Sequence, residues 1–264
     1  MEKKQHKKTN SIIQLLIVVV VGITSISSSF SQTKQKLPCL DRKFTIIVHI
    51  VRDSLGQPNI TETDISSAIS VVNQDFSPIC VSFEICEFRY IDNFQYDILD
   101  EQNEVPELEI KYHEKNRINM YLVQNTSSGN SFAMSTIGDL DGGGIVIVKI
   151  SGPRVYSHEM GHYFGLPHTF AGSGELVDGS NCSTTGDLIC DTPADPFIDG
   201  TDGENYVDAN CRFIDMQQDA NGDYYTPDIG NIMSYYPDRC KCGFSHDQFW
   251  IMVNTYLNSN PKMW

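Results

Sequence analysis

Basic residues are scarce in this sequence. Its 264 residues include 19 Lys and Arg against 34 Asp and Glu, so the formal net charge is -15. Nucleic acids and anionic membrane surfaces attract proteins through clustered positive charge, which this composition does not supply. We therefore expect neither nucleic acid nor a stable membrane association among the partners of this chain.

Long apolar runs are equally rare, and the main one lies near the N-terminus. Residues 12–23 are predominantly apolar, follow four lysines between positions 3 and 8, and precede the small-x-small triplet Ser29-Phe30-Ser31. This order is typical of a secretory signal peptide, and the run is short for a membrane span. We expect residues 1–31 to be removed and the mature chain to be secreted, with an uncleaved N-terminal anchor as the alternative. Four lysines and one glutamate leave with the signal, so the net charge changes from -15 to -18.

No cysteine lies near the predicted cleavage site, which argues against attachment of a lipid there. The eight cysteines all follow it, and an even number in an exported chain favours disulfides over free thiols. Spacing alone leaves their pairing open, although full pairing would require at least one bridge between the two halves of the chain. The disulfide candidates are Cys39, Cys80, Cys86, Cys182, Cys190, Cys211, Cys240 and Cys242.

Strand and helix patterns alternate along the first two thirds of the chain. Residues 44–51, 81–91, 118–123 and 144–150 predict strands, the last one entered from the glycine-rich turn at residues 141–144. Residues 61–76 predict a helix capped by Thr61 or Thr63, and residues 245–257 predict another that begins with a capping box. This alternation predicts an α+β fold in which helices pack on a mixed sheet. Residues 170–225 lack periodicity and predict long loops.

The segment from His158 to His168 carries the most specific pattern in the sequence. Pro153 opens a helix on which His158 and His162, four residues apart, share one face. Gly165 follows, where a positive φ can end the helix and bring His168 back as a third ligand. Three imidazoles with one open position are typical of a catalytic zinc site, because structural sites fill all four positions. Glu159, on the edge of the same face, can then act as a general base.

The pattern His158-Glu159-x-x-His162-x-x-Gly165-x-x-His168 resembles the zinc motif of the metzincin metallopeptidases. Asn231-Ile232-Met233-Ser234-Tyr235 resembles their second signature, the methionine turn. The resemblance implies that Met233 forms an apolar floor beneath the ligands and that Tyr235 helps to stabilise the tetrahedral intermediate.

Within the metzincins, the sequence is most similar to the pappalysin family and its ulilysin-like members. The similarity rests on His168-Thr169-Phe170, on the segment from Gly186 to Pro193, and on Cys240 followed by Phe244-Ser245-x-x-Gln248. It implies a two-lobed catalytic domain over residues 43–264, preceded by a short N-terminal or pro segment at 32–42. The upper lobe, 43–168, would hold a twisted sheet and the zinc helix. The lower lobe, 169–264, would be irregular, with the methionine turn and the C-terminal helix.

Two features depart from that family pattern. Cys190 and Cys242 stand where the family has no expected cysteines, and we predict an extra bridge between them. Cys39 is predicted to pair with Cys80 or Cys86. The alternative is a latency switch in which its thiolate caps the zinc.

Acidic residues of the expected lower lobe suggest a second cation. The resemblance to ulilysin-like enzymes implies calcium there, and Asp187 and Asp191 offer carboxylate oxygens at close spacing. The loop Asp219-Ala220-Asn221-Gly222-Asp223 offers more, but it lacks the distal glutamate of an EF-hand. Solvated acidic loops are the alternative interpretation.

These patterns together predict a secreted, monomeric zinc metalloendopeptidase that acts on proteins or peptides. One alternative is a non-catalytic extracellular binding protein or toxin component that keeps the metzincin shell. Another is a zinc hydrolase of non-peptide amides. The presence of Glu159 favours an enzyme, because a binding protein has no physical need of a base beside the metal. The sequence does not fix the P1′ preference.

Overall fold

The computed structural model describes residues 35–134 and 143–259. The described residues from Gln35 onwards cluster into one compact unit. The predicted signal peptide lies outside the described residues. Asp141 and Gly142 of the predicted turn also lie outside them. Within the described ranges, no helix is both long and apolar enough to cross a membrane.

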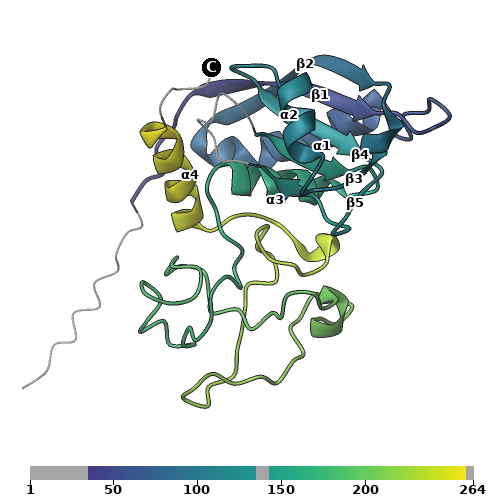
Figure 1. Cartoon of the computed structure of the whole chain (residues 1–264). Helices are drawn as coiled ribbons and strands as arrows, with labels where there is room; N and C mark the ends of the chain where they lie inside the picture. The colour runs from purple at the N-terminus through teal and green to yellow at the C-terminus, as the bar shows by residue number, and fades with distance from the viewer. Residues whose placement is uncertain (1–34, 135–142, 260–264) are drawn as a thin grey trace, which may run out of the picture. The chain divides into compact units, whose positions relative to one another are not determined.

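A five-stranded mixed sheet forms the centre of this unit (Figure 1). Its strand order is β2-β1-β4-β7-β6, and all neighbours are parallel except β6, which pairs antiparallel with β7 at one edge. The four longer strands lie where the sequence predicts strands, although β7 is shorter than expected. The bounds are β1 Arg42–Val51, β2 Val81–Ile91, β4 Ile118–Val123, β6 Phe132–Ala133 and β7 Ile145–Val148. The short strands β3 Ile98–Leu99 and β5 Asn125–Thr126 pair separately.

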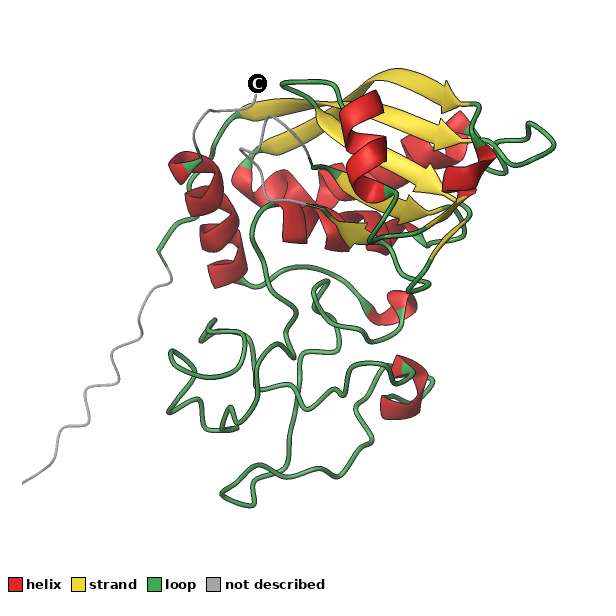
Figure 2. Ribbon diagram, in the orientation of Figure 1, coloured by secondary structure: helices red, strands yellow, loops and turns green. Residues whose placement is uncertain are grey.

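Both faces of the sheet are covered, which explains why its inner strands β4 and β7 are buried throughout. Alternate residues of a strand point to opposite faces. In β4, Met120 and Leu122 join one buried cluster, whereas Tyr121 and Val123 join another on the other face. Figure 2 shows the helices on both sides of the sheet. The helices α1 Glu62–Phe76 and α3 Pro153–Tyr163 supply the first cluster, and α2 Val105–Tyr112 supplies the second.

The helix caps follow the sequence closely. Thr61 caps α1 in a capping box with Asp64, so the cap is Thr61 rather than Thr63. Ser245 and Gln248 form the predicted capping box of α4, which spans His246–Asn258. The apolar face of α4 returns to the main cluster, where the Tyr256 ring lies 5.3 Å from that of Phe44.

The segment between α3 and α4 is irregular, as predicted. It contains the short 3-10 helices η3 Gly203–Tyr206 and η4 Asp238–Cys240 and a small apolar cluster of its own. Two disulfides, Cys182–Cys190 and Cys211–Cys240, cross-link it. Because such loops bury little apolar surface, cross-links of this kind compensate for a small core.

The disulfides confirm one cysteine prediction and correct another. Cys39 pairs with Cys80, one of the two expected partners, so its sulfur is not free to cap a metal as the alternative of a latency switch would require. Cys190 pairs with Cys182 and not with Cys242, so the predicted extra bridge is wrong. Cys86 and Cys242 are free and exposed. Cys182 is a nearer partner for Cys190 along the chain, at a separation of 8 residues.

Candidate metal centre

The end of α3 is built to bring a third histidine back to the helix. Gly165 has φ +89°, and its N–H donates to the carbonyl of His162 at 2.8 Å. The next N–H, of Leu166, donates to the carbonyl of Gly161 at 3.0 Å. These two bonds form a Schellman motif, which ends the helix and reverses the chain. The reversal carries His168 back towards the helix face.

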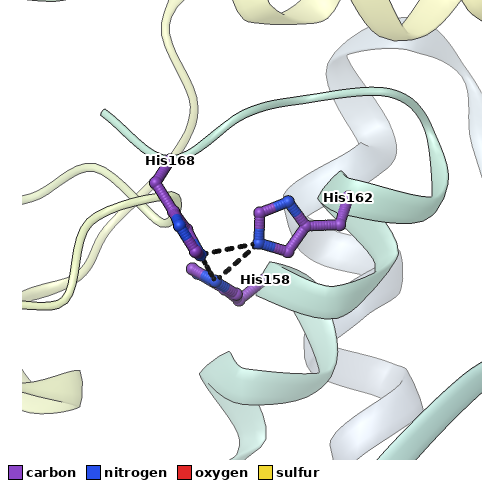
Figure 3. A group of neighbouring side chains, drawn as sticks. All are labelled: His158, His162 and His168. Carbon is purple, nitrogen blue, oxygen red and sulfur yellow. Dashed lines mark hydrogen bonds between the residues drawn. The ribbon is translucent and has the colours of Figure 1, made fainter. Parts of the chain in front are cut away.

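The imidazoles of His158, His162 and His168 face one another (Figure 3). Their Nε2 atoms lie 3.0 Å apart between His158 and His162, 2.8 Å between His162 and His168, and 3.1 Å between His168 and His158. The predicted helix face and the chain reversal therefore bring the three side chains to one point.

Main-chain carbonyls set the orientation of two of these rings. Nδ1 of His158 lies 2.7 Å from the Ile232 oxygen, and Nδ1 of His162 lies 2.7 Å from the Leu166 oxygen. Each Nδ1 must carry the proton to donate to a carbonyl, which leaves the Nε2 lone pair free. Burial lowers the pKa of all three histidines, that of His168 to about 3, so the rings are neutral at pH 7.

This donor set fits zinc. Three neutral imidazoles with converging lone pairs would repel one another without a cation between them, and their carbonyl partners match the outer contacts of metal-binding histidines. Zinc–nitrogen bonds of about 2.0–2.1 Å in a tetrahedral site place the nitrogens about 3.3 Å apart. The observed separations of 2.8 to 3.1 Å need only small movements to reach that spacing.

Glu159 lies beside the three histidines and is almost fully buried, with 4% of its surface exposed. Among the described residues its Oε2 atom has no hydrogen-bond partner. Burial raises the pKa of its carboxyl to about 8, and the nearby Lys241 ammonium opposes that rise. A buried carboxyl with an unpaired oxygen next to a metal site is suited to exchanging a proton with a substrate or water.

Met233 packs against α3, and Tyr235 lies beside two of the three histidines. A Cβ added to Gly161, which lies between the two helical histidines, would be 2.5 Å from the Met233 sulfur, so that sulfur packs directly against the α3 backbone. The Tyr235 ring centroid lies 4.5 Å from that of His168 and 5.6 Å from that of His158. Burial and the charge of Glu159 raise the pKa of Tyr235 to about 12, so its hydroxyl keeps its proton.

Two side chains that hold the methionine turn were not foreseen. The amides of Asn231 and Gln248 bond to each other at 2.9 and 3.1 Å, and Asn231 also accepts the N–H of Met233. The capping box signalled a helix start at Ser245, but it gave no sign that the Gln248 side chain also anchors the turn. Such a pairing through space leaves no local pattern in the sequence.

Two cavities flank the metal centre and share Glu159 and Tyr235 in their walls. One, of about 320 Å³, extends past His158 to Val155 and Lys241. The other, of about 400 Å³, extends past His162 and His168 along the edge strand β6. A chain lying across the centre could therefore place a side chain on each side of it.

The predicted calcium residues are engaged with the protein itself. Asp187 accepts from Ile189 N and Thr192 Oγ1, and Asp191 accepts from Ser245 Oγ and Asp247 N. Potential ligand atoms of Asp191, His246 and Asp247 lie within 4.8 Å of one another, beside the start of α4. Calcium binding stays a prediction.

The buried carboxyl groups of this region predict a pH-dependent stability. Burial raises the pKa of Glu175 from 4.5 to about 7 and that of Asp187 from 3.8 to about 6. The folded state thus holds protons that the unfolded state has lost, so stability falls as pH rises from about 4 to about 8. Glu175→Gln should be more stable than the parent at pH 8 by on the order of 2 kcal/mol, with little difference at pH 4.

Urea denaturation of the parent and of Glu175→Gln at several pH values, in calcium-free buffer at fixed zinc, would measure how the free energy of unfolding changes with pH. An unchanged slope in the variant would contradict the role of Glu175. If added calcium stabilises the parent at pH 8, the calcium prediction gains its first support, because a cation favours ionised carboxylates.

Gly165 predicts a large effect of a single methyl group. Gly165→Ala would place a Cβ at φ +89° and 2.6 Å from Thr255 Oγ1, whereas Gly222, at φ +87°, has open space around it. We expect roughly 1 kcal/mol of destabilisation for Gly222→Ala from backbone strain and roughly 2–4 kcal/mol for Gly165→Ala. Chemical denaturation would compare the two variants. Equal losses would show that the contact with Thr255 carries no cost.

Comparisons with known proteins show that the fold and the segment with the three histidines resemble those of metallopeptidases. The sequence model of the family described as Peptidase M66 matches residues 103–189, which include the whole motif. In structure, the chain is similar to mature mirolysin of Tannerella forsythia in complex with a cleaved peptide, with a TM-score of 0.60 and 16% identity over 84% of this chain and 93% of that one. The predicted fold class is thereby confirmed.

Curated relatives agree with this class. An extracellular metalloprotease of Colletotrichum graminicola is 24% identical over 68% of this chain and 70% of its own length. Another, of Verticillium alfalfae, is 23% identical over 80% of this chain and 75% of its own length. These relatives are named metalloproteases, and for this chain the pappalysin subtype stays a prediction.

Proposed function

We propose that this chain is a secreted zinc endopeptidase, with His158, His162 and His168 as zinc ligands and Glu159 as general base. The observation that carries the proposal is the approach of three neutral Nε2 atoms to within 2.8 to 3.1 Å of one another. The buried, unpaired oxygen of Glu159 beside them supports hydrolysis rather than metal storage.

A bound zinc ion would polarise the substrate carbonyl and lower the pKa of water to about 7. Glu159 would accept a proton from the attacking water and later deliver it to the leaving amine. The Tyr235 hydroxyl, protonated at neutral pH, would donate to the carbonyl oxygen as negative charge develops there. Met233 would support the ligands from below through its contact with α3. The two flanking cavities would hold the side chains next to the cut bond.

Secretion is part of the proposal. It is supported by the three disulfides, which persist in oxidising compartments, and by relatives named extracellular metalloproteases. The predicted signal peptide at residues 1–31 is the feature that would direct export. Expression of the full chain with analysis of the mature N-terminus would test it.

Endopeptidase activity is tested with the purified mature chain, loaded with one equivalent of zinc, on casein and on a peptide library. Mass spectrometry of the products would identify the cut bonds. We expect internal cleavage that a chelator stops and zinc restores. Absence of any cut in a fully zinc-loaded sample would overturn the proposal and favour a binding protein or an amidase for other substrates.

A further inference from the structure

A charged side chain in the cavity of about 320 Å³ beside His158 has no role in the hydrolysis described above. The Lys241 side chain lines this cavity together with His158 and Glu159, and only 6% of it is exposed. Among the described residues its ammonium forms one ion pair, with Asp238 Oδ1 at 3.4 Å. Lysine is rarely buried to this extent, and its three N–H donors exceed what one long contact can satisfy.

We propose that this cavity holds the substrate side chain next to the cut bond and that Lys241 selects a carboxylate side chain there over a basic one. The inference rests on the proposed function, since it concerns the specificity of the same site. Lys241 is a specificity-determining residue in this view and takes no part in bond cleavage.

The position of the cavity supports the first half of this proposal. Its wall includes His158, Glu159 and Tyr235, the groups around which the reacting carbonyl must lie. A side chain that enters it therefore belongs to a residue directly beside the cut bond. Val155 and Tyr236 line the same cavity and offer surface for the methylene groups of such a side chain.

The charges around the cavity support the second half. Asp202 and Asp238 also line it, but Asp202 is exposed and its carboxylate accepts from Glu204 N. Asp238 faces Lys241 and abuts the start of α3, where a Cβ on Gly152 would lie 2.4 Å from its Oδ2 atom. Lys241 thus neutralises the acid that could otherwise receive a basic side chain.

The difference in binding free energy between acidic and basic side chains follows from the burial of Lys241. A substrate carboxylate would accept from the unused donors of Lys241 in a site where water screens charges weakly. A substrate lysine or arginine would bring a second positive charge to the same buried ammonium. The other buried acid among the described lining residues, Glu159, is committed to the attacking water in the proposed mechanism. An amide side chain would accept a hydrogen bond but gain less, because it is uncharged.

The test uses a peptide taken from a mapped cut site and varied to Glu, Gln or Lys on each side of the bond. We expect the wild-type enzyme to show a preference at one of the two positions beside the bond. There, kcat/KM for the Glu peptide should exceed that for the Gln peptide by on the order of tenfold, and that for the Lys peptide by on the order of a hundredfold. Lys241→Met should reduce these ratios to about one while the Gln peptide is still cut. Lys241→Arg should keep the preference, and Lys241→Glu should reverse it.

A second measurement does not require cleavage. Calorimetric titration of the zinc-loaded Glu159→Gln variant with the same peptides should show tighter binding of the Glu peptide, and the added Lys241→Met change should remove the difference. A preference for basic residues, or ratios that Lys241→Met leaves unchanged, would overturn this inference alone. A wild-type protein that neither cuts nor binds any peptide would overturn the proposed function with it.

Discussion

Glu159→Ala is expected to lower kcat/KM for peptide hydrolysis by about a hundredfold to ten-thousandfold, the usual contribution of a positioned acid or base. The reason is that, among the described residues, no other carboxyl group lines both cavities of the centre. The variant should still bind one zinc per chain, because the three imidazoles remain in place. Steady-state kinetics on a cut peptide, with metal analysis of the same sample, measure both quantities.

The matched control for this variant is Glu84→Ala. Glu84 is another glutamate, but its side chain is 55% exposed and pairs with Lys43 at the surface. Its removal should leave kcat/KM unchanged, since exposed ion pairs contribute little. If Glu159→Ala retained the wild-type rate, the assignment of the base would be wrong. If it lost its zinc, Glu159 would be a ligand instead.

His168→Ala is expected to abolish both activity and tight zinc binding. The two helical histidines alone leave the metal with two protein ligands, and catalytic zinc sites use three. Zinc that binds only the folded state stabilises it by about 4 kcal/mol when its free concentration is a thousand times the Kd. The variant should therefore also lose most of the zinc-dependent rise in thermal stability. Equilibrium dialysis and melting curves with and without zinc would measure these losses.

His113→Ala is the control for that experiment. His113 is a part-buried histidine whose Nδ1 atom lies 3.2 Å from the Gly143 oxygen, and it is not part of the three-histidine group. The His113→Ala variant should bind one zinc per chain and cleave peptides at the wild-type rate. A His168→Ala protein that still binds zinc tightly and cuts peptides would show that the third ligand lies elsewhere.

Local sequence patterns predicted much of the fold and of the candidate site. Helix spacing placed His158 and His162 on one face, and a glycine able to adopt positive φ predicted the turn that returns His168. The β-branched runs predicted the four longer strands, and Ser245 with Gln248 predicted the cap of α4. Each of these features depends on residues that are close in the sequence, so the chain alone contains the information.

Other features of the centre were decided only by the tertiary structure. The carbonyl of Ile232 orients His158, the amides of Asn231 and Gln248 fix the methionine turn, and Lys241 enters the cavity beside Glu159. Cysteine pairing belongs to the same class, since Cys190 bonds to Cys182 although Cys242 was expected.

The physical reason is the same in each case. A short motif predicts which side chains share a helix face, because the helical backbone fixes their geometry within a few residues. It does not predict which distant loop packs against that face, because the position of the loop depends on the path of the whole chain. The sequence by itself therefore predicted the metal ligands and the base, and the tertiary structure decided how these side chains are oriented and which charges line the cavities beside them.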